Sequence, residues 1–513
     1  MSKLIVDTNV RCHLEDEDDV GFLWELDKEL SFDVQGAEHT RAFKRGWMDP
    51  FEGKFVRWDG TEKLLESDNL SFPIGLRHRV EELYKRDNRE LEIVDNRSKK
   101  SIREWHAYSD VLERLQSIHK VPYPHQIQAL NATKQHDRGI IRVATGGGKT
   151  LIAALIVSNI GKKAIVYVIG KDLLYQIHKF FECLFPSVKV GIIGDGKCEI
   201  GDINIASVWT VGCALGIQKG HVLYESDNDE AKMEPAKYGK IRQMMQEAKV
   251  NILDECHVAA CQTIQEIAKH ISPEHFYGMS ASPWRDDGAD LLIESVLGQN
   301  IVDISASKLI REGLLVKPVI KFERVPKMPG FKKNFQTIYK NYVVENNVRN
   351  QMVTDATDSL VSKGYKTLVL YNSVRHGKIL YDQISKRVPC VLLSGKDSQK
   401  VRLQAREDLN EKKIGCIIAS RIFDIGVDMP SLSGLVIAGC GKSSVRALQR
   451  IGRVIRRHSF YNSRIKNMDK KKLAAVVDFV DDAAYLKYHA QERKKIYSTE
   501  EEFDIKWPTK QTI

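Results

Sequence analysis

The residues most plainly suited to chemistry form a glycine-rich run, ATGGGKT, at 144–150. Glycine has no Cβ, so this backbone can wrap closely around a phosphate while the loop amides and a following helix N-terminus face the anion. Lys149 would bridge the β- and γ-phosphates and Thr150 would ligate Mg²⁺. The run therefore predicts a site for ATP and Mg²⁺, although Val143 replaces the usual first glycine or alanine and a simple glycine-rich turn is the alternative. The expected nucleotide-binding residues in this run are Thr145, Gly146, Gly147, Gly148, Lys149 and Thr150.

An acid pair, Asp254 and Glu255, follows the apolar segment VNIL about 100 residues later. A carboxylate at the end of a strand, beside a phosphate loop, is well placed to hold Mg²⁺, so we expect Asp254 and Thr150 as its ligands. Glu255 is then the expected base that orients the attacking water. A helix-capping acid pair is the alternative, but it does not account for two such motifs in this order.

A third candidate is the basic segment QRIGRVIR at 449–456. Arg453 and Arg456 are three residues apart, so they share one helix face. A guanidinium can bind a γ-phosphate through two hydrogen bonds and stabilise charge in the transition state. A solvated basic helix is the alternative for this segment alone. We assign catalytic roles to Lys149, Asp254, Glu255, Gln449, Arg453 and Arg456.

These residues need a framework, and the chain from about residue 113 repeats a short apolar strand, a turn and a helical pattern. The strands are continuous apolar runs, as expected for parallel strands that are covered on both faces. The sequence predicts them at 140–145, 164–170, 203–209, 250–256, 276–282, 367–372, 390–395, 414–420, 434–439 and 474–480. The fold class is therefore α/β, with two tandem doubly wound parallel sheets preceded by a small N-terminal α/β domain. We expect domains at 1–112, 113–316 and 317–513.

Composition restricts the possible classes of binding partner only slightly. Lys plus Arg number 78 and Asp plus Glu 68, and the resulting net charge of +10 suits a polyanion without requiring one. The nine cysteines contain no CxxC pair, so neither a zinc site nor a disulfide framework is expected. The start of the chain does not read as a signal peptide, and no apolar run reaches the roughly 18 residues that span a bilayer. We expect a cytoplasmic protein.

The motifs together resemble the superfamily-two helicases over about residues 113–460, in the order of that family. The resemblance implies that Gln126, in YPHQ, contacts adenine and that Ser280-Ala281-Ser282 couples hydrolysis to movement, with Ser282 in place of the commoner threonine. Residues 419–428 match the fifth motif, whose Gly426 and Asp428 are expected at the nucleotide. The resemblance implies RecA-like motor domains that close around ATP and open after hydrolysis.

The same resemblance implies a nucleic-acid track across both motor domains. Small hydroxyl side chains and amides at strand ends suit phosphate contact without choice of base. Trp209 could stack on a base, although a buried core tryptophan is the equal alternative. The expected contacts are Lys171, Ser207, Trp209, Thr210, Ser373, Ser420 and Arg421.

The first 110 residues mix aromatic and basic side chains, notably at 39–47 with Arg45 and Trp47. This mixture suits single-stranded DNA, but a solvated face around core aromatics is equally compatible. The segments FVRWDG (55–60) and PIGL (73–76) resemble the N-terminal domain of UvsW-type phage helicases, whose motor is related to those of RecG and XPB. That resemblance implies branch migration of Holliday junctions and forks, 3′-to-5′ movement, action as a monomer, and a bacterial host cytoplasm.

Three other interpretations stay open. An RNA helicase would carry similar motifs, because a DECH-like box (254–257) occurs in both groups. A duplex DNA translocase subunit of a restriction or nuclease system would move without unwinding, and the chain offers no convincing nuclease constellation. A degenerate nucleic-acid clamp without hydrolysis is opposed by the intact Lys149, Asp254, Glu255, Arg453 and Arg456.

Overall fold

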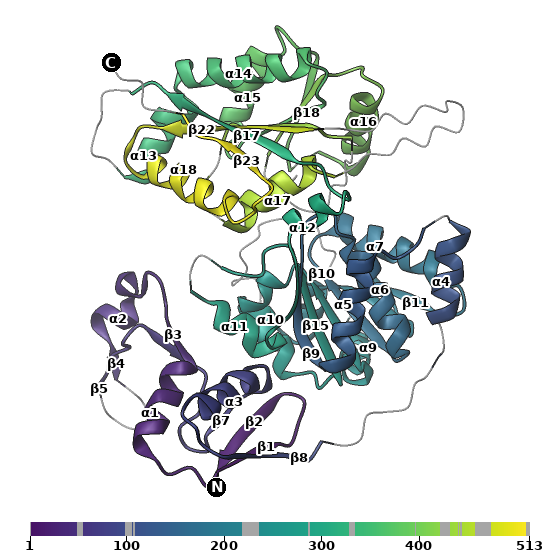
Figure 1. Cartoon of the computed structure of the whole chain (residues 1–513), viewed down its shortest axis with the longest axis vertical. Coiled ribbons are helices and arrows are strands. Elements are labelled where there is room, and N and C mark those ends of the chain that lie inside the picture. Colours follow the sequence, from purple (N-terminus) through teal and green to yellow (C-terminus); the bar gives the residue numbers. More distant parts are fainter. Residues whose placement is uncertain are drawn as a thin grey trace. The chain divides into compact units, whose positions relative to one another are not determined.

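In the computed structural model the chain forms two compact units. Figure 1 shows the chain coloured by residue number. The first comprises residues 1–142 and 149–303, and the second comprises residues 143–148 and 304–513. The structure describes residues 2–48, 55–97, 105, 108–118, 120–217, 235–285, 288–327, 334–395, 397–420, 431–439, 441, 444–456 and 473–508.

The N-terminal part of the first unit is a four-stranded sheet in the order β7-β2-β1-β8. Its strands are β1 (Ser2–Val6), β2 (Arg11–Glu15), β7 (Ser71–Pro73) and β8 (Leu91–Asp95). Along β2, Cys12 and Leu14 are buried while their neighbours are less so, which is the period of two of a half-buried strand. Two short antiparallel pairs complete the strands here: β3 (Ser31–Asp33) with β6 (Thr61–Lys63), and β4 (Trp47–Met48) with β5 (Phe55–Val56).

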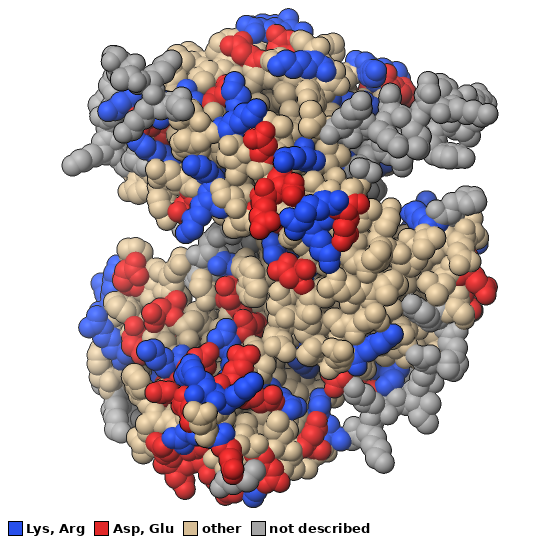
Figure 2. All heavy atoms as spheres, viewed as in Figure 1, with Lys and Arg blue, Asp and Glu red and all other residues tan. Residues whose placement is uncertain are grey.

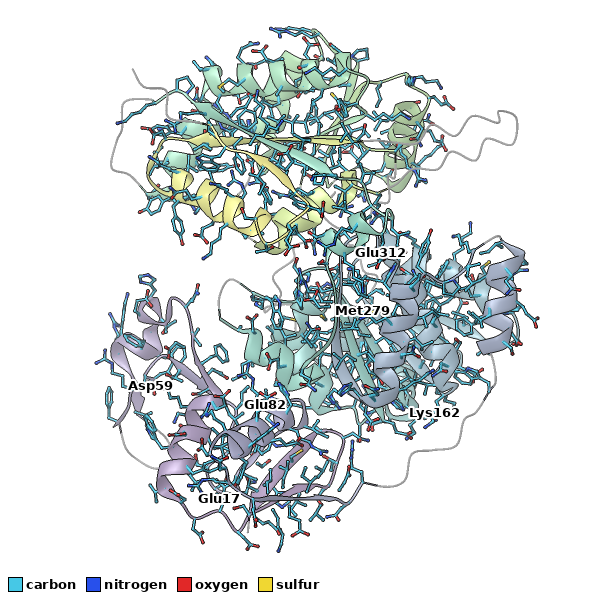
Figure 3. The ribbon with its side chains drawn as sticks, viewed as in Figure 1. Glu17, Asp59, Glu82, Lys162, Met279 and Glu312 are labelled. Atoms are coloured by element: carbon cyan, nitrogen blue, oxygen red, sulfur yellow. The ribbon has the colours of Figure 1, made fainter. Side chains whose placement is uncertain are left out.

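Two ten-residue helices, α1 (Val20–Glu29) and α3 (Arg77–Arg86), bury their apolar sides in this N-terminal core. The Asp19 carboxylate caps α1 by accepting hydrogen bonds from the amides of Gly21 and Phe22. Phe22 meets Tyr84 of α3 edge to face, with ring centroids 4.5 Å apart. Glu17, labelled in Figure 3, is buried and accepts a 2.6 Å hydrogen bond from the Tyr84 hydroxyl. A short helix, α2 (Arg41–Arg45), lies between β3 and β4.

The first motor sheet has eight strands in the order β12-β11-β13-β10-β14-β15-β9-β16. The strands are β9 (Arg138–Val143), β10 (Ala164–Val168), β11 (Val190–Gly194), β12 (Lys197–Glu199), β13 (Ile203–Ser207), β14 (Val250–Asp254), β15 (His275–Ser280) and β16 (Asn300–Ile304). β10, β13, β14 and β15 are buried along their whole length. Parallel pairing places their carboxyl ends along one edge of the sheet.

Helices cover this sheet on both faces (Figure 1). The helices are α4 (Tyr108–Ser117), α5 (Pro124–Gln135), α6 (Lys149–Ile160), α7 (Lys171–Leu184), α8 (Val208–Ala214), α9 (Pro235–Glu247), α10 (Gln262–Lys269) and α11 (Asp290–Leu297). α4 and α5 pack against α6, and α8 packs against α9 and α10. The core under α8 to α11 joins Val211, Met244, Ile264 and Ile293.

The N-terminal sheet and the first motor sheet are joined by a buried contact at α11. Leu291 of α11 belongs to the N-terminal hydrophobic core. A Cβ added to Gly75 would lie 2.1 Å from the Glu294 carbonyl oxygen, so only glycine allows this approach. Arg79 donates two hydrogen bonds to the Glu294 carboxylate, at 2.7 and 3.1 Å, and His78 lies 3.3 Å from it. The two sheets therefore form one body.

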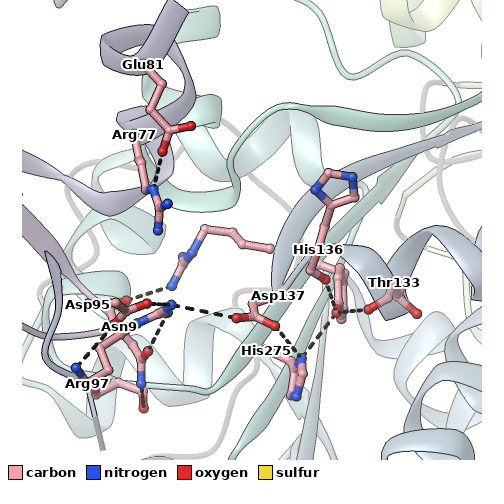
Figure 4. A network of polar contacts seen from close by, with 12 residues as sticks. Asn9, Arg77, Glu81, Asp95, Arg97, Thr133, His136, Asp137 and His275 are labelled. Atoms are coloured by element: carbon pink, nitrogen blue, oxygen red, sulfur yellow. Dashed lines mark hydrogen bonds and ion pairs between the residues drawn. The ribbon is translucent and has the colours of Figure 1, made fainter. Parts of the chain in front are cut away.

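A second polar network crosses the same junction (Figure 4). Arg97 pairs with Asp95, donates a 3.2 Å hydrogen bond to Asn9 and lies 3.8 Å from Asp137 of the motor part. Arg138 of β9 reaches back and donates a 2.7 Å hydrogen bond to the Asn9 carbonyl. These contacts tie the end of β8 to the start of β9.

The second motor sheet is parallel throughout, in the order β19-β20-β18-β21-β22-β17-β23. Its strands are β17 (Pro318–Val325), β18 (Thr367–Leu370), β19 (Cys390–Leu393), β20 (Cys416–Ala419), β21 (Gly434–Ile437), β22 (Ala474–Asp481) and β23 (Asp504–Lys506). Its helices are α12 (Ala306–Arg311), α13 (Phe335–Tyr339), α14 (Asn347–Ser362), α15 (Val374–Ile384), α16 (Gln399–Asn410), α17 (Ser444–Val454) and α18 (Ala484–Tyr497), and a π-helical turn, η4 (Lys340–Val344), follows α13.

The structure has a strand at each of the ten predicted positions, and the expected α/β fold class is confirmed. It also contains strands that the apolar-run criterion did not predict, among them β11, β16, β17 and β23. β17 alternates buried and less buried side chains, which explains why it does not appear as a continuous apolar run.

Charge is mixed over the face of the molecule in Figure 2, where basic and acidic side chains are interleaved. The positive net charge therefore does not single out a nucleic-acid surface on that face. Among the described residues, no helix combines the length and apolar character needed to cross a membrane.

Candidate nucleotide site

The phosphate loop joins the end of β9, at Val143, to the first residue of α6, Lys149. Gly146 and Gly148 have φ of 93° and 83°, a region that residues with a Cβ rarely adopt. The Gly147 amide donates a 2.9 Å hydrogen bond to the Ala144 carbonyl and closes the turn. Two of the three glycines are therefore required by the backbone itself.

The two expected carboxylates stand at the end of β14, which lies between β10 and β15. Lys149 Nζ is 2.7 Å from Glu255 Oε1 and 3.9 Å from Asp254 Oδ1. The structure thus brings together the predicted lysine and the predicted acid pair, which are more than 100 residues apart in sequence. Thr150 follows Lys149 directly in the first turn of α6.

The pKa values of these carboxyl groups are pushed in opposite directions. Burial raises the pKa of Asp254 to about 6, against the attraction of Lys149. Burial would also raise the pKa of Glu255, but the Lys149 ammonium, together with His257, holds it well below its usual value. Glu255 is therefore firmly ionised at neutral pH, as a base that orients water requires.

The donor set suits a divalent cation. Asp254 Oδ1 is buried and has no hydrogen-bond partner among the described residues. A hard cation such as Mg²⁺ prefers carboxylate and hydroxyl oxygens, and ligation would stabilise the ionised form of a carboxylate that burial disfavours. Asp254, with the Thr150 hydroxyl, could hold such an ion.

The motif at the end of β15 reaches the same acid. The Ser280 hydroxyl is 3.5 Å from Glu255 Oε2, and it accepts a 3.1 Å hydrogen bond from the Ser282 amide. Ala281 and Ser282 are both buried. The predicted coupling segment 280–282 therefore contacts the predicted base directly through Ser280.

Two residues near the site carried no assigned role in the sequence analysis. His257 Nδ1 is 3.5 Å from Glu255 Oε2, and the His257 carbonyl accepts a hydrogen bond from Arg285. His257 thus connects the acid to the segment after the Ser280 motif. Its place in the box 254–257 could have identified it.

The second such residue is Tyr123, which lies at the predicted adenine position. Gln126 is buried and its Oε1 accepts a 2.9 Å hydrogen bond from the Tyr123 amide, which caps α5. The Tyr123 ring is 51% exposed and stacks on His125 at 5.8 Å. Tyr123 therefore offers an open aromatic face near Gln126. The presence of an aromatic residue three positions before that glutamine could have identified it.

The basic motif begins on α17 in the second unit, which also includes the phosphate-loop segment 143–148. The prediction that Arg453 and Arg456 share one helix face is wrong, because α17 ends at Val454 and Arg456 lies beyond it, in an antiparallel β-bridge with Leu315. Gln449, Arg453 and Arg456 are half-buried. Within this unit a Cβ on Gly452 would lie 2.4 Å from the Thr145 Cβ, and one on Gly146 would lie 3.2 Å from the Arg456 Cγ. The basic motif therefore adjoins the glycine-rich backbone in that unit.

The predicted nucleic-acid contacts follow strand ends in both units. In the first, Lys171 begins α7 and pairs with Asp195 at 2.6 Å, while Ser207 and Thr210 are buried and Trp209 is half-buried. In the second, Ser373 precedes α15 and Ser420 follows β20. Each pair of parent strands, β10 with β13 and β18 with β20, is adjacent in its sheet.

In the N-terminal part, Arg45 is exposed at the end of α2 and Trp47 begins β4. Arg57, just after β5, lies over the Phe43 ring of α2 at 5.4 Å. Basic and aromatic groups thus lie together in the segment formed by α2, β4, β5 and Arg57, which we call the hairpin. Gly426, Asp428 and Arg421 fall outside the described residues.

Comparison with known proteins gives two family matches. Residues 119–285 match the model "Type III restriction enzyme, res subunit", and residues 349–458 match "Helicase conserved C-terminal domain". The ATP-dependent DNA helicase uvsW of Enterobacteria phage T4 is 25% identical over 92% of this chain and 89% of its own length. Putative helicase 22 of Sulfolobus islandicus filamentous virus is 24% identical over 62% of this chain and 58% of its own length.

The fold is also found among solved structures. The chain resembles a point variant of S. cerevisiae Dbp5 bound to RNA and ADP BeF3, with a TM-score of 0.53, 16% identity and coverage of 77% of this chain and 92% of that one. This likeness supports the fold alone: two tandem RecA-like domains. The two family matches span the phosphate loop and acid box in one motor part and the arginine motif in the other. The chain belongs to the superfamily-two helicases and is a helicase-type, nucleic-acid-dependent ATPase.

Proposed function

We propose that this chain is an ATP-dependent DNA helicase or translocase that unwinds and branch-migrates Holliday junctions and forks, moving 3′-to-5′. The observation that carries the proposal is the cluster of Lys149, Asp254, Glu255 and Ser280 at the carboxyl edge of the first motor sheet. It joins a phosphate-binding lysine, a metal-type carboxylate, an ionised base and a hydroxyl in one contact network.

In this proposal the chain binds ATP with Mg²⁺, which would be held by Thr150 and Asp254 and would neutralise phosphate charge. A phosphate in the loop competes with Glu255 for the Lys149 ammonium, and this leaves Glu255 to orient water. Because Ser280 contacts Glu255, a movement of Glu255 shifts Ser280 and with it Ala281 and Ser282. Arg453 and Arg456 bring positive charge to the γ-phosphate and Gln449 offers a neutral amide donor, while Gln126, Gly426 and Asp428 complete the nucleotide contacts.

The choice of DNA rests on the helicase relatives, several of which are named for DNA helicase or translocase activity. The proposed domain scheme is 1–112, 113–316 and 317–513. We assign the track to Lys171, Ser207, Trp209, Thr210, Ser373, Ser420 and Arg421, and junction reading to the hairpin around Arg45 and Trp47. Action as a monomer on DNA belongs to the same proposal.

The test is strand separation with ATP and Mg²⁺ on a mobile four-way junction and on a tailed linear duplex of equal length. Faster processing of the junction supports branch migration. A preference for the tailed duplex makes the chain a general helicase. Deleting residues 1–97 would uncover Leu291 and leave Glu294 without Arg79, so the junction reader is better tested with Arg45→Ala in the full chain.

A duplex DNA translocase of a restriction system is the second candidate. The match of residues 119–285 to the type III restriction family model favours it. This candidate predicts DNA-stimulated ATP hydrolysis without separation of either substrate. Displacement of a triplex-forming strand from an intact duplex would then detect the movement.

A further inference from the structure

Five aromatic rings gather on one side of the second motor part, contributed by α13 and α18. Phe335 meets Tyr339 at 5.9 Å, Tyr485 at 6.2 Å and His489 at 5.6 Å between ring centroids. Tyr488 of the same helix lies 6.3 Å from His489. Phe335, Tyr485 and Tyr488 are 41, 52 and 55% exposed, which is unusual for neighbouring large rings. We call these five residues the aromatic patch.

The patch has a fixed base. Beneath it Ile338, Tyr342 and Val343 of the α13–η4 segment pack against Leu486 of α18, and all four are buried. The Asn334 side chain caps α13 by accepting a 3.0 Å hydrogen bond from the Thr337 amide. The exposed rings are therefore held by a packed core and are not loose side chains on a loop.

The patch lies at the carboxyl edge of the sheet. α13 follows the end of β17, and α18 follows the end of β22. A Cβ on Gly439, just past β21, would lie 2.8 Å from the Tyr339 hydroxyl and 2.9 Å from the Asn372 amide. Since Ser373 is the next residue, the patch is contiguous with the strand-end segment that we assign to the nucleic-acid track.

Asp482, just before α18, lies among basic side chains. The Lys487 ammonium pairs with Asp482 at 3.0 Å and, together with Lys327 and Arg324, holds the pKa of Asp482 below its usual value. One carboxylate thus faces three cations at the base of α18. Basic groups beside open aromatic faces are the combination that binds unpaired nucleic acid.

We propose that the aromatic patch is a stacking platform for unpaired bases, continuing the nucleic-acid track beyond Ser373. Phe335, Tyr485 and Tyr488 supply the faces, and the nearby cations bind the backbone. The occupant is single-stranded DNA, because a base presents a flat π-face that a duplex keeps inside its stack. This inference rests on the proposed function and names the part of the second motor domain that holds the separated strand.

The test uses the full chain with the double substitution Phe335→Ala, Tyr485→Ala. The probe is a fluorescent thymidine oligonucleotide, compared with an abasic oligonucleotide of the same length, and binding is read by anisotropy. We expect about tenfold weaker binding of the base-bearing strand, since loss of one stacked base is worth roughly this factor. Binding of the abasic strand should not change, because it has no base to stack.

Two control variants separate stacking from folding. Tyr381→Ala removes an exposed tyrosine on α15, outside the patch, and should leave both affinities unchanged. Tyr485→Phe keeps the ring and should bind as wild type. Equal binding by the double variant and wild type, or equal loss with the abasic strand, overturns the platform. Wild-type ATPase that no DNA stimulates would instead overturn the proposed function itself.

Discussion

Two buried carboxylate centres in the first unit meet cations in different ways. At the junction with the N-terminal sheet, Glu294 receives two hydrogen bonds from Arg79 and lies 3.3 Å from His78. At the nucleotide site, Lys149 is shared between Glu255 and Asp254, and Asp254 Oδ1 has no hydrogen-bond partner among the described residues. The first centre is saturated and joins two sheets, while the second retains capacity for a ligand. Burial alone therefore does not mark a functional carboxylate, but incomplete pairing does.

The largest effect should come from Lys149→Ala. Removing the ammonium takes away the phosphate ligand, so we expect ATP hydrolysis to fall by at least about 100-fold. DNA binding should change little, whereas the melting temperature should fall, because Asp254 and Glu255 lose the cation that they share. Phosphate release and a melting curve measure both, and retained turnover would show that the loop is not the phosphate site.

Glu255→Gln should separate nucleotide binding from hydrolysis. The amide keeps the size of the side chain but cannot accept a proton, so we expect hydrolysis to drop by about 100-fold while a fluorescent ATP analogue still binds. The matched control is Glu274→Gln, a carboxylate of the same unit that pairs with Lys162 at 2.5 Å, away from the site. Normal hydrolysis by Glu255→Gln would remove it from the role of base.

Substitution at the Glu294 centre should lower the stability of the fold. Arg79→Ala leaves Glu294 buried with His78 as its remaining partner, and we expect a loss of about 2–3 kcal/mol in the free energy of unfolding. Motor activity per folded molecule should persist. Urea unfolding gives the stability, and an unchanged midpoint would mean that the junction contributes little to folding.

The two centres should also differ in pH dependence. The pKa of Asp254 is raised to about 6, so metal binding should weaken as pH falls through 6, when a proton competes for the carboxylate. Although burial opposes it, pairing with His78 and Arg79 lowers the pKa of Glu294 below its usual value, so the stabilising effect of this carboxylate should persist down to more acidic pH. Mg²⁺ titration of ATPase activity from pH 5 to 8 tests the first statement. An apparent Mg²⁺ affinity that is independent of pH would contradict it.

The smallest effect should come from the exposed hairpin. Arg45→Ala removes one phosphate contact of the proposed junction reader, so we expect DNA affinity to fall about two- to fivefold and the salt dependence to become shallower by about one ion. Junction binding at several salt concentrations measures this. An unchanged slope would remove Arg45 from the interface.

Features encoded by a short, continuous stretch of sequence could be predicted, and features formed by distant segments could not. Continuous apolar runs predicted ten of the motor strands, because covered parallel strands need them. β11, which contains Gly191 and Gly194, and the alternating β17 gave no such run. In the site, chemistry restricts residue types within short motifs, so Lys149 and Asp254 could be found. The aromatic patch could not, because its rings come from segments about 150 residues apart and meet only in the fold.

The most direct test of the central claim is phosphate release by the full chain with ATP and Mg²⁺, in the presence and absence of single-stranded DNA. The cluster of Lys149, Asp254 and Glu255 predicts hydrolysis that DNA stimulates and that Lys149→Ala abolishes. No hydrolysis with any DNA or RNA would contradict it, and the chain would then be a nucleic-acid clamp that has lost its motor.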